Sequence, residues 1–127
     1  IENYAALKQM LTAKGRTFQS QTDSEVVVQL IEAILDADPG LSFEAAIRLA
    51  LKQVTGTYGL AIVSPREPGR LFVARRGSPL LVGLGEGEAF VASDATPIVE
   101  YTNRVVYLDD GELAVVGPGT CDVRTID

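Results

Sequence analysis

The chain contains no histidine, and among its 127 residues there is a single cysteine, Cys121. Without histidine, a serine or cysteine triad that relies on a histidine base is excluded within this chain, and so is a zinc site of the Cys/His type. One cysteine cannot form an internal disulfide, which fits a reducing compartment and predicts a cytoplasmic location. Any chemistry must therefore come from carboxylates, lysine, tyrosine, hydroxyls or backbone groups.

Basic residues and long apolar runs are also scarce. Eleven Lys and Arg residues stand against 17 Asp and Glu residues, which gives a net charge of −6. This balance argues against a nucleic-acid partner, since such partners require clustered basic residues. No apolar run reaches the length of a membrane span, and no segment looks like a signal peptide, so no membrane partner is expected. The chain begins at Ile1 and opens almost directly into a helical pattern, and we expect it to be a piece of a longer protein.

Apolar spacing predicts helices first and antiparallel strands afterwards, an α+β fold. The first helix follows Asn3 as its cap and ends at Gly15, the second spans about 23–36, and the third follows Ser42 and ends near Val54. The apolar period then changes to two residues, and short turns separate seven expected strands. These strands lie at 57–64, 70–76, 79–85, 89–93, 104–108, 112–117 and 121–126. Because the connections are short, we expect consecutive strands to pair with each other.

The predicted strands are apolar on both faces, as in LAIV, LFVA and LLVG. An antiparallel sheet with one wet face should alternate apolar and polar residues, so both faces of these strands are expected to be covered. The last strand alternates better, which predicts an edge position. If neighbouring layers are missing, an exposed patch should drive self-association into a homo-oligomer.

The stretch SQTDSEVV, residues 20–27, predicts the start of the second helix. Thr22 suits the N-cap, and Glu25 three residues later completes a capping box. Asp23 then falls in the first turn, where a negative charge favours the helix dipole. Local rules alone therefore assign each of these polar residues to the helix end.

Three other motifs are most simply structural. Gly83, Gly85 and Gly87 are not followed by a helix, as a dinucleotide site requires, so they predict a hairpin. The segment 109–112 (Asp-Asp-Gly-Glu) lacks the spacing of a calcium loop and predicts a hairpin turn, and no metal site is expected. Cys121 lies in an alternating strand and predicts a small strand residue rather than an activated thiol.

Five separated motifs in order resemble one family: IENYAALKQML, SQTDSEV, GTYGLAIV, ARRGSPLLVGLGEGEAFVASD and YLDDGELAVV. They are similar to the glutaminase (class II glutamine amidotransferase) domains of glucosamine-6-phosphate synthases, also called glutamine–fructose-6-phosphate aminotransferases (isomerizing). The resemblance covers Ile1 to about Val116. It implies the C-terminal part of an αββα sandwich of the N-terminal-nucleophile (Ntn) hydrolase type. Residues 1–127 are then a partial domain without its nucleophile.

The family's activity is hydrolysis of the glutamine amide by an N-terminal cysteine, whose own α-amino group acts as the base. The ammonia passes to a sugar-phosphate isomerase domain of the same chain, and no cofactor is implied. The resemblance places the nucleophile, the oxyanion donors and a carboxylate-binding arginine before Ile1, so no catalytic residue is expected in this chain. Asp23 matches the carboxylate that binds the α-ammonium of glutamine, with Thr22 and Glu25 as the supporting cap.

Two other interpretations remain. The chain could be a non-catalytic domain of the same fold that binds a metabolite or a partner. It could also belong to the related glutaminase domain of amidophosphoribosyltransferases, which shares the Thr-Asp-x-Glu helix start. Residues 77–80 (Gly-Ser-Pro-Leu) and the pair Ser93-Asp94 favour the aminosugar synthase over that relative.

Overall fold

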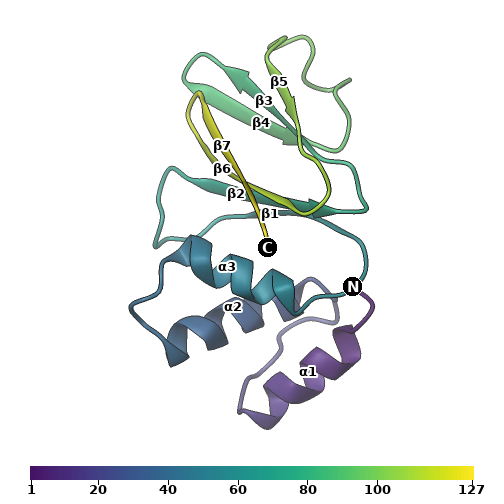
Figure 1. Ribbon diagram of the computed structural model, residues 1–127, viewed down its shortest axis with the longest axis vertical. Helices are drawn as coiled ribbons and strands as arrows, with labels where there is room; N and C mark the ends of the chain where they lie inside the picture. Colours follow the sequence, from purple (N-terminus) through teal and green to yellow (C-terminus); the bar gives the residue numbers. More distant parts are fainter. The chain divides into compact units, whose positions relative to one another are not determined.

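The computed structural model describes all residues from 1 to 127 and separates into two compact units. The first unit spans Ile1–Gly56 and the second Thr57–Asp127. Figure 1 shows that the first unit is helical and the second is built of strands. The α+β class predicted from the sequence is confirmed, with the helices first in the chain.

The first unit contains three helices: α1 (Tyr4–Ala13), α2 (Glu25–Ala37) and α3 (Phe43–Lys52). Each helix buries apolar side chains at a spacing of three to four residues, the pattern of a helix with one apolar face. Those on α2 are Val26, Val27, Leu30, Ile31 and Leu35, and those on α3 are Phe43, Ala46, Ile47, Ala50 and Leu51. α2 contacts both α1 and α3.

Two of the expected helix ends are confirmed. The Ser42 hydroxyl accepts the Ala45 backbone N–H at 3.1 Å and so caps α3. After α1, Gly15 adopts a φ of +89°, which glycine reaches without steric cost. The N–H groups of Gly15 and Arg16 donate to the carbonyls of Thr12 and Leu11, each at 3.0 Å, so the helix closes with a Schellman motif.

Asn3 does not have the role that was predicted for it. It precedes α1, but its side chain makes no cap hydrogen bond to the helix. Its amide nitrogen donates to the Gln53 carbonyl at 2.7 Å, and its amide oxygen accepts the Thr55 N–H at 3.0 Å. The side chain therefore fastens the segment after α3 to the start of the unit, and these two bonds take precedence over helix capping.

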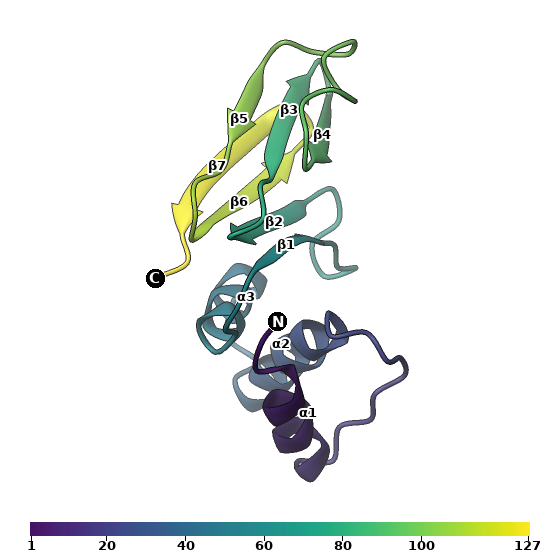
Figure 2. The same cartoon turned by 90° about the vertical axis from the view of Figure 1, so that its right-hand side faces the viewer.

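The second unit contains seven strands in two antiparallel sheets (Figure 2). The larger sheet has the order β1-β2-β6-β7, and the smaller one has the order β4-β3-β5. The strands are β1 (Tyr58–Ile62), β2 (Leu71–Arg76), β3 (Leu81–Gly85), β4 (Glu88–Ala92), β5 (Val105–Tyr107), β6 (Glu112–Gly117) and β7 (Thr120–Thr125). All seven strands predicted from the alternating pattern are present, and β7 is an edge strand as expected.

The expected pairing of consecutive strands is wrong at two connections. β1–β2, β3–β4 and β6–β7 are hairpins, but β2 pairs with β6 rather than with β3, and β5 pairs with β3 rather than with β6. The segments 77–80 and 108–111 therefore carry the chain from one sheet to the other. A short connection brings two strands close together, but it does not require that they share a hydrogen-bonded ladder.

The two sheets share an apolar cluster within the second unit. It combines Val73 of β2 and Val82 of β3 with Leu108 and with Ala114 and Val116 of β6. Residues of the opposite parity on β2 and β6 are buried as well: Phe72, Ala74, Leu113 and Val115. Both faces of β2 are thus removed from solvent, as the non-alternating LFVA predicted, and Leu81 and Val82 of β3 are also buried on opposite faces. The same prediction is wrong for LAIV, because β1 is an edge strand on which Gly59 and Ala61 are exposed. None of the three helices is both long and apolar enough to cross a bilayer.

Candidate functional site

Asp23 lies in a short turn that leads into α2, and its carboxylate is accessible. Its side chain is 49% exposed, and its backbone carbonyl accepts the Val26 N–H at 3.2 Å. Oδ2 lies 3.1 Å from the backbone nitrogen of Ile1. Because about half of the side chain is exposed, the carboxylate is accessible to a nitrogen donor, and a charged pair with an ammonium group would be stronger than a neutral hydrogen bond.

The carboxylate of Glu25 accepts four hydrogen bonds, three from the segment before the helix and one from within it. Oε1 accepts the Ser20 N–H at 2.7 Å and the Ser20 hydroxyl at 2.6 Å. Oε2 accepts the Gln19 N–H at 2.8 Å and the side-chain amide of Gln29, one turn along α2, at 3.2 Å. Two consecutive backbone N–H groups of the preceding segment are thus satisfied by one side chain at the first position of α2.

The capping box predicted from Thr22 and Glu25 is wrong. The helix begins at Glu25, and the flanking residue Ser24 has helical dihedral angles and no side-chain cap bond. The Thr22 hydroxyl lies 2.9 Å from the Ser20 hydroxyl instead. Because residues 23 and 24 form a turn, Glu25 comes first in the helix rather than third, and its side chain reaches back past the cap position to Ser20.

This hydrogen bonding changes the acidity of Glu25. Donation from the Ser20 hydroxyl, followed by that from the Gln19 N–H, lowers the pKa of Glu25 from 4.5 to about 2. Hydrogen bonds to a carboxylate favour its charged form, and here they outweigh the opposing effect of desolvation. Glu25 is therefore an anion throughout the neutral and mildly acidic range.

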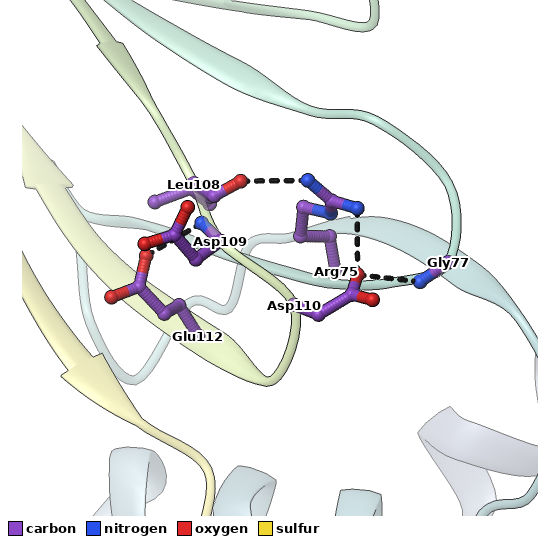
Figure 3. A network of polar contacts seen from close by, with 6 residues as sticks. All are labelled: Arg75, Gly77, Leu108, Asp109, Asp110 and Glu112. Carbon is purple, nitrogen blue, oxygen red and sulfur yellow. Dashed lines mark hydrogen bonds and ion pairs between the residues drawn. The ribbon is translucent and has the colours of Figure 1, made fainter.

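A second polar network joins the two segments that connect the sheets (Figure 3). Arg75 of β2 donates to the Leu108 carbonyl at 2.8 Å and to the Asp110 carboxylate at 2.6 Å. The same carboxylate oxygen accepts the Gly77 N–H at 2.8 Å, which lowers the pKa of Asp110, with a smaller contribution from Arg75. One carboxylate thus holds the Gly-Ser-Pro-Leu segment and the Asp-Asp-Gly-Glu segment together.

The hairpin predicted for the Asp-Asp-Gly-Glu segment is wrong, because β5 and β6 lie in different sheets. Its carboxylates have structural partners: Asp110 as described, and Glu112, which accepts the Asp109 N–H at 2.7 Å (Figure 3). The glycine-rich hairpin, in contrast, is confirmed. Gly85 of β3 pairs with Glu88 of β4, and Gly87 between them has a φ of +66°.

A pocket of about 350 Å³ lies beside the connecting segments. Its lining includes Arg75, Asp94, Tyr107 and Asp109. Arg75 is engaged by Asp110, and the Asp94 carboxylate accepts both the backbone N–H and the hydroxyl of Thr96 at 3.0 Å. These hydrogen bonds, the backbone bond most of all, lower the pKa of Asp94. Arg75 and Asp94 therefore have partners within the fold, and we assign this pocket no ligand.

Cys121 is half-buried on the edge strand β7. Burial raises the pKa of its thiol, and the neighbouring charge of Asp122 raises it further. A thiol with a raised pKa is a poor nucleophile at neutral pH, since the thiolate is the reactive form. Cys121 therefore has the character of a structural residue, as its sequence context indicated.

Comparison with known proteins identifies the family. The family described as "Glutamine amidotransferase domain" matches residues 1–100. The chain belongs to this family. The assignment agrees with the resemblance found from the five sequence motifs.

Two relatives over the full length of the chain carry the same name, glutamine–fructose-6-phosphate aminotransferase [isomerizing]. The protein from Chlorobaculum tepidum is 58% identical over 127 residues, which is 100% of this chain and 21% of the relative. The one from Bacteroides thetaiotaomicron is 51% identical over the same 127 residues and 20% of its own length. The chain thus spans about a fifth of the length of these relatives.

Solved structures support the fold. The structure of glutamine phosphoribosylpyrophosphate (PRPP) amidotransferase from B. subtilis, complexed with ADP and GMP, matches with a TM-score of 0.80 and 24% identity. The match covers 98% of this chain and 27% of that chain. The fold is therefore the Ntn-type amidotransferase fold that the resemblance implied, and at this identity the match supports the fold alone.

Proposed function

We propose that this chain is part of the glutaminase domain of an enzyme that converts fructose 6-phosphate to glucosamine 6-phosphate with ammonia from glutamine. The observation that carries the proposal is the 58% identity, over the whole chain, to a relative named for an amino transfer from glutamine to fructose 6-phosphate. The chain is then a partial amidotransferase domain, and the rest of the machinery belongs to other parts of the parent protein. The amidophosphoribosyltransferase alternative is supported at the level of fold only.

Within this chain, the proposed contact to substrate is Asp23. Its half-exposed carboxylate is accessible and could pair with an ammonium group, the functional group that glutamine presents at its α-carbon. A carboxylate paired with a primary ammonium would fix one end of the substrate and leave the amide free to reach a nucleophile elsewhere. Thr22 and Glu25 then support the turn that carries Asp23, by bonds other than a capping box.

The chain by itself is proposed to lack glutaminase activity. It has no histidine, and the pKa of its cysteine is raised by burial. An internal cysteine also has no free α-amino group that could serve as its base. Glutamine and a sugar-phosphate isomerase domain of the same parent chain are the proposed partners. Assembly of the parent as a homo-oligomer and a cytoplasmic location are proposed with them.

The test uses the full-length parent protein and the isolated 127-residue chain. Glutamate release from glutamine and glucosamine 6-phosphate formation are measured for wild type, for Asp23→Asn and for Asp38→Asn. Asp38 follows α2, so its replacement removes an equal charge from the other end of the same helix. We expect Asp23→Asn to raise KM for glutamine about tenfold or more, as loss of a charged hydrogen bond predicts, and Asp38→Asn to leave it unchanged. Ammonia release by the pure isolated chain, or equal KM values for the two variants, would contradict the proposal.

A further inference from the structure

Asp23 is held in place by few contacts of its own side chain. About half of that side chain is exposed, so packing does not enclose it. The direction of a short, half-exposed carboxylate depends mainly on the backbone that carries it. Whatever fixes the turn from Ser20 to Glu25 therefore fixes the position of the proposed ammonium-binding group.

Glu25 joins the two ends of this turn to each other. It is the last residue of the turn, and through Oε1 it binds both the N–H and the hydroxyl of Ser20, the first residue. The Ser20 hydroxyl also contacts the middle of the turn, because it lies 2.9 Å from the hydroxyl of Thr22, the neighbour of Asp23. Asp23 is thus located inside a loop of six residues whose ends are joined by one carboxylate.

The segment before the turn is anchored to the same helix. Gln29 donates to the Thr17 carbonyl at 3.2 Å as well as to Glu25 at 3.2 Å, so one amide connects the two. On the other side, the Lys8 ammonium of α1 lies 5.3 Å from the centre of the Phe18 ring, within the range of a cation–π contact. The incoming chain is therefore bonded to α2 and lies against α1 before the turn begins, and Glu25 supplies the side-chain bonds that join the two ends of the turn.

We infer that Glu25 is a positioning residue for the binding of the substrate's α-ammonium group, acting through the turn that carries Asp23. The inference rests on the proposed function of Asp23. A carboxylate is needed rather than an amide, because each of its oxygens faces two donors. In Glu25→Gln, the NH₂ group would face a backbone N–H, that of Ser20 or that of Gln19, whichever way the amide turned, and one bond of the closure would be lost.

The experiment measures how well the full-length protein recognises an α-ammonium group. The readout is the ratio of kcat/KM for glutamine to kcat/KM for glutaramate, which is glutamine without its α-amino group. A loss of general stability lowers both values and leaves the ratio unchanged, whereas misplacement of Asp23 lowers the ratio. Ser42→Ala is the matched control, since it removes a helix cap in the same unit but outside the turn.

We expect Asp23→Asn to lower the ratio about tenfold or more and Glu25→Gln to lower it about three- to tenfold, because a small displacement weakens a directed ion pair. Ser42→Ala should leave the ratio at the wild-type value. In the double variant, Glu25→Gln should cause no further fall beyond Asp23→Asn, since it acts through that residue. If Glu25→Gln does not fold, Ser20→Ala removes one donor of the closure, and its ratio is expected to lie between those of wild type and Asp23→Asn.

The failures of the two proposals can be told apart. A wild-type protein that hydrolyses no glutamine, or an unchanged ratio in Asp23→Asn, overturns the proposed function and this inference with it. A low ratio in Asp23→Asn, together with wild-type ratios in Glu25→Gln and Ser20→Ala, overturns this inference alone. A fall in the ratio for Glu25→Gln, together with equal ratios for Asp23→Asn and the double variant and an unchanged ratio for Ser42→Ala, supports both.

Discussion

Replacement of Gly77 by alanine tests how closely the first connecting segment, 77–80, packs against Thr57. Gly77 has a φ of +83°, and a Cβ atom on it would lie 2.4 Å from Cγ2 and 2.9 Å from Cβ of Thr57. The left-handed conformation costs a residue with a Cβ atom about 1–2 kcal/mol, and overpacking against Thr57 adds about 1–3 kcal/mol. We therefore expect Gly77→Ala to lower the free energy of unfolding by about 2–5 kcal/mol, measured by urea denaturation.

Gly87→Ala separates the two contributions. Gly87 has a φ of +66°, but no atom lies within 4 Å of its added Cβ, so only the conformational cost of about 1–2 kcal/mol applies. Thr57→Ser removes the nearest methyl group and should restore part of the stability of Gly77→Ala, while the contact at 2.9 Å remains. Equal urea midpoints for Gly77→Ala and Gly87→Ala, at unchanged m-values, would refute the close approach of Thr57.

Three further outcomes are expected. Ser42→Ala should lower the free energy of unfolding by about 1 kcal/mol through loss of the α3 cap, and a change below the error of urea denaturation would contradict that role. The pKa of Glu25 is lower in the folded state than its usual 4.5, so its contribution to stability should be complete above pH 4.5 and be lost as the pH falls toward 2. In pH-dependent denaturation, Glu25→Gln should remove this part of the acid sensitivity. The isolated chain should self-associate, because β1, β7, β4 and β5 are sheet edges and because Val99 and Tyr101 are 59% and 64% exposed. A monodisperse monomer in light scattering would count against this expectation.

The secondary structure was largely predictable because local rules determine it. The Ser42 cap and the Gly15 end follow from side-chain and backbone preferences that act within a few residues. The burial of β2 and β3 on both faces followed from their lack of alternation, since a strand with one wet face keeps polar residues on it, but β1 has an exposed face despite the same pattern. Asn3 failed as a cap because residues 53–55, fifty positions away, compete for the same amide, and local rules contain no information about that segment.

At the turn that carries Asp23, the sequence predicted a capping box, and the structure has a different set of bonds. Thr22 and Glu25 have the spacing of a capping box, and the sequence offered no reason to prefer another partner for Glu25. The partner that prevails is Ser20, five residues earlier, which supplies two donors to one carboxylate oxygen where a capping box supplies one backbone N–H. A Ser-x-x-x-x-Glu spacing across a turn is the signal that could have indicated this closure.

The partition of the strands between two sheets was the part that sequence could not supply. The connections 77–80 and 108–111 have the length of ordinary hairpin turns, so length alone gave the wrong partners for β2 and β5. What distinguishes them is the bonding of Arg75 and Asp110, which are 35 residues apart in the chain and hold the two connections to each other. Arg75 lies in β2 opposite Glu112 of β6, so its bond to Asp110 is formed in the arrangement in which β2 pairs with β6 rather than with β3. A contact between residues this far apart in the chain has no local sequence signal.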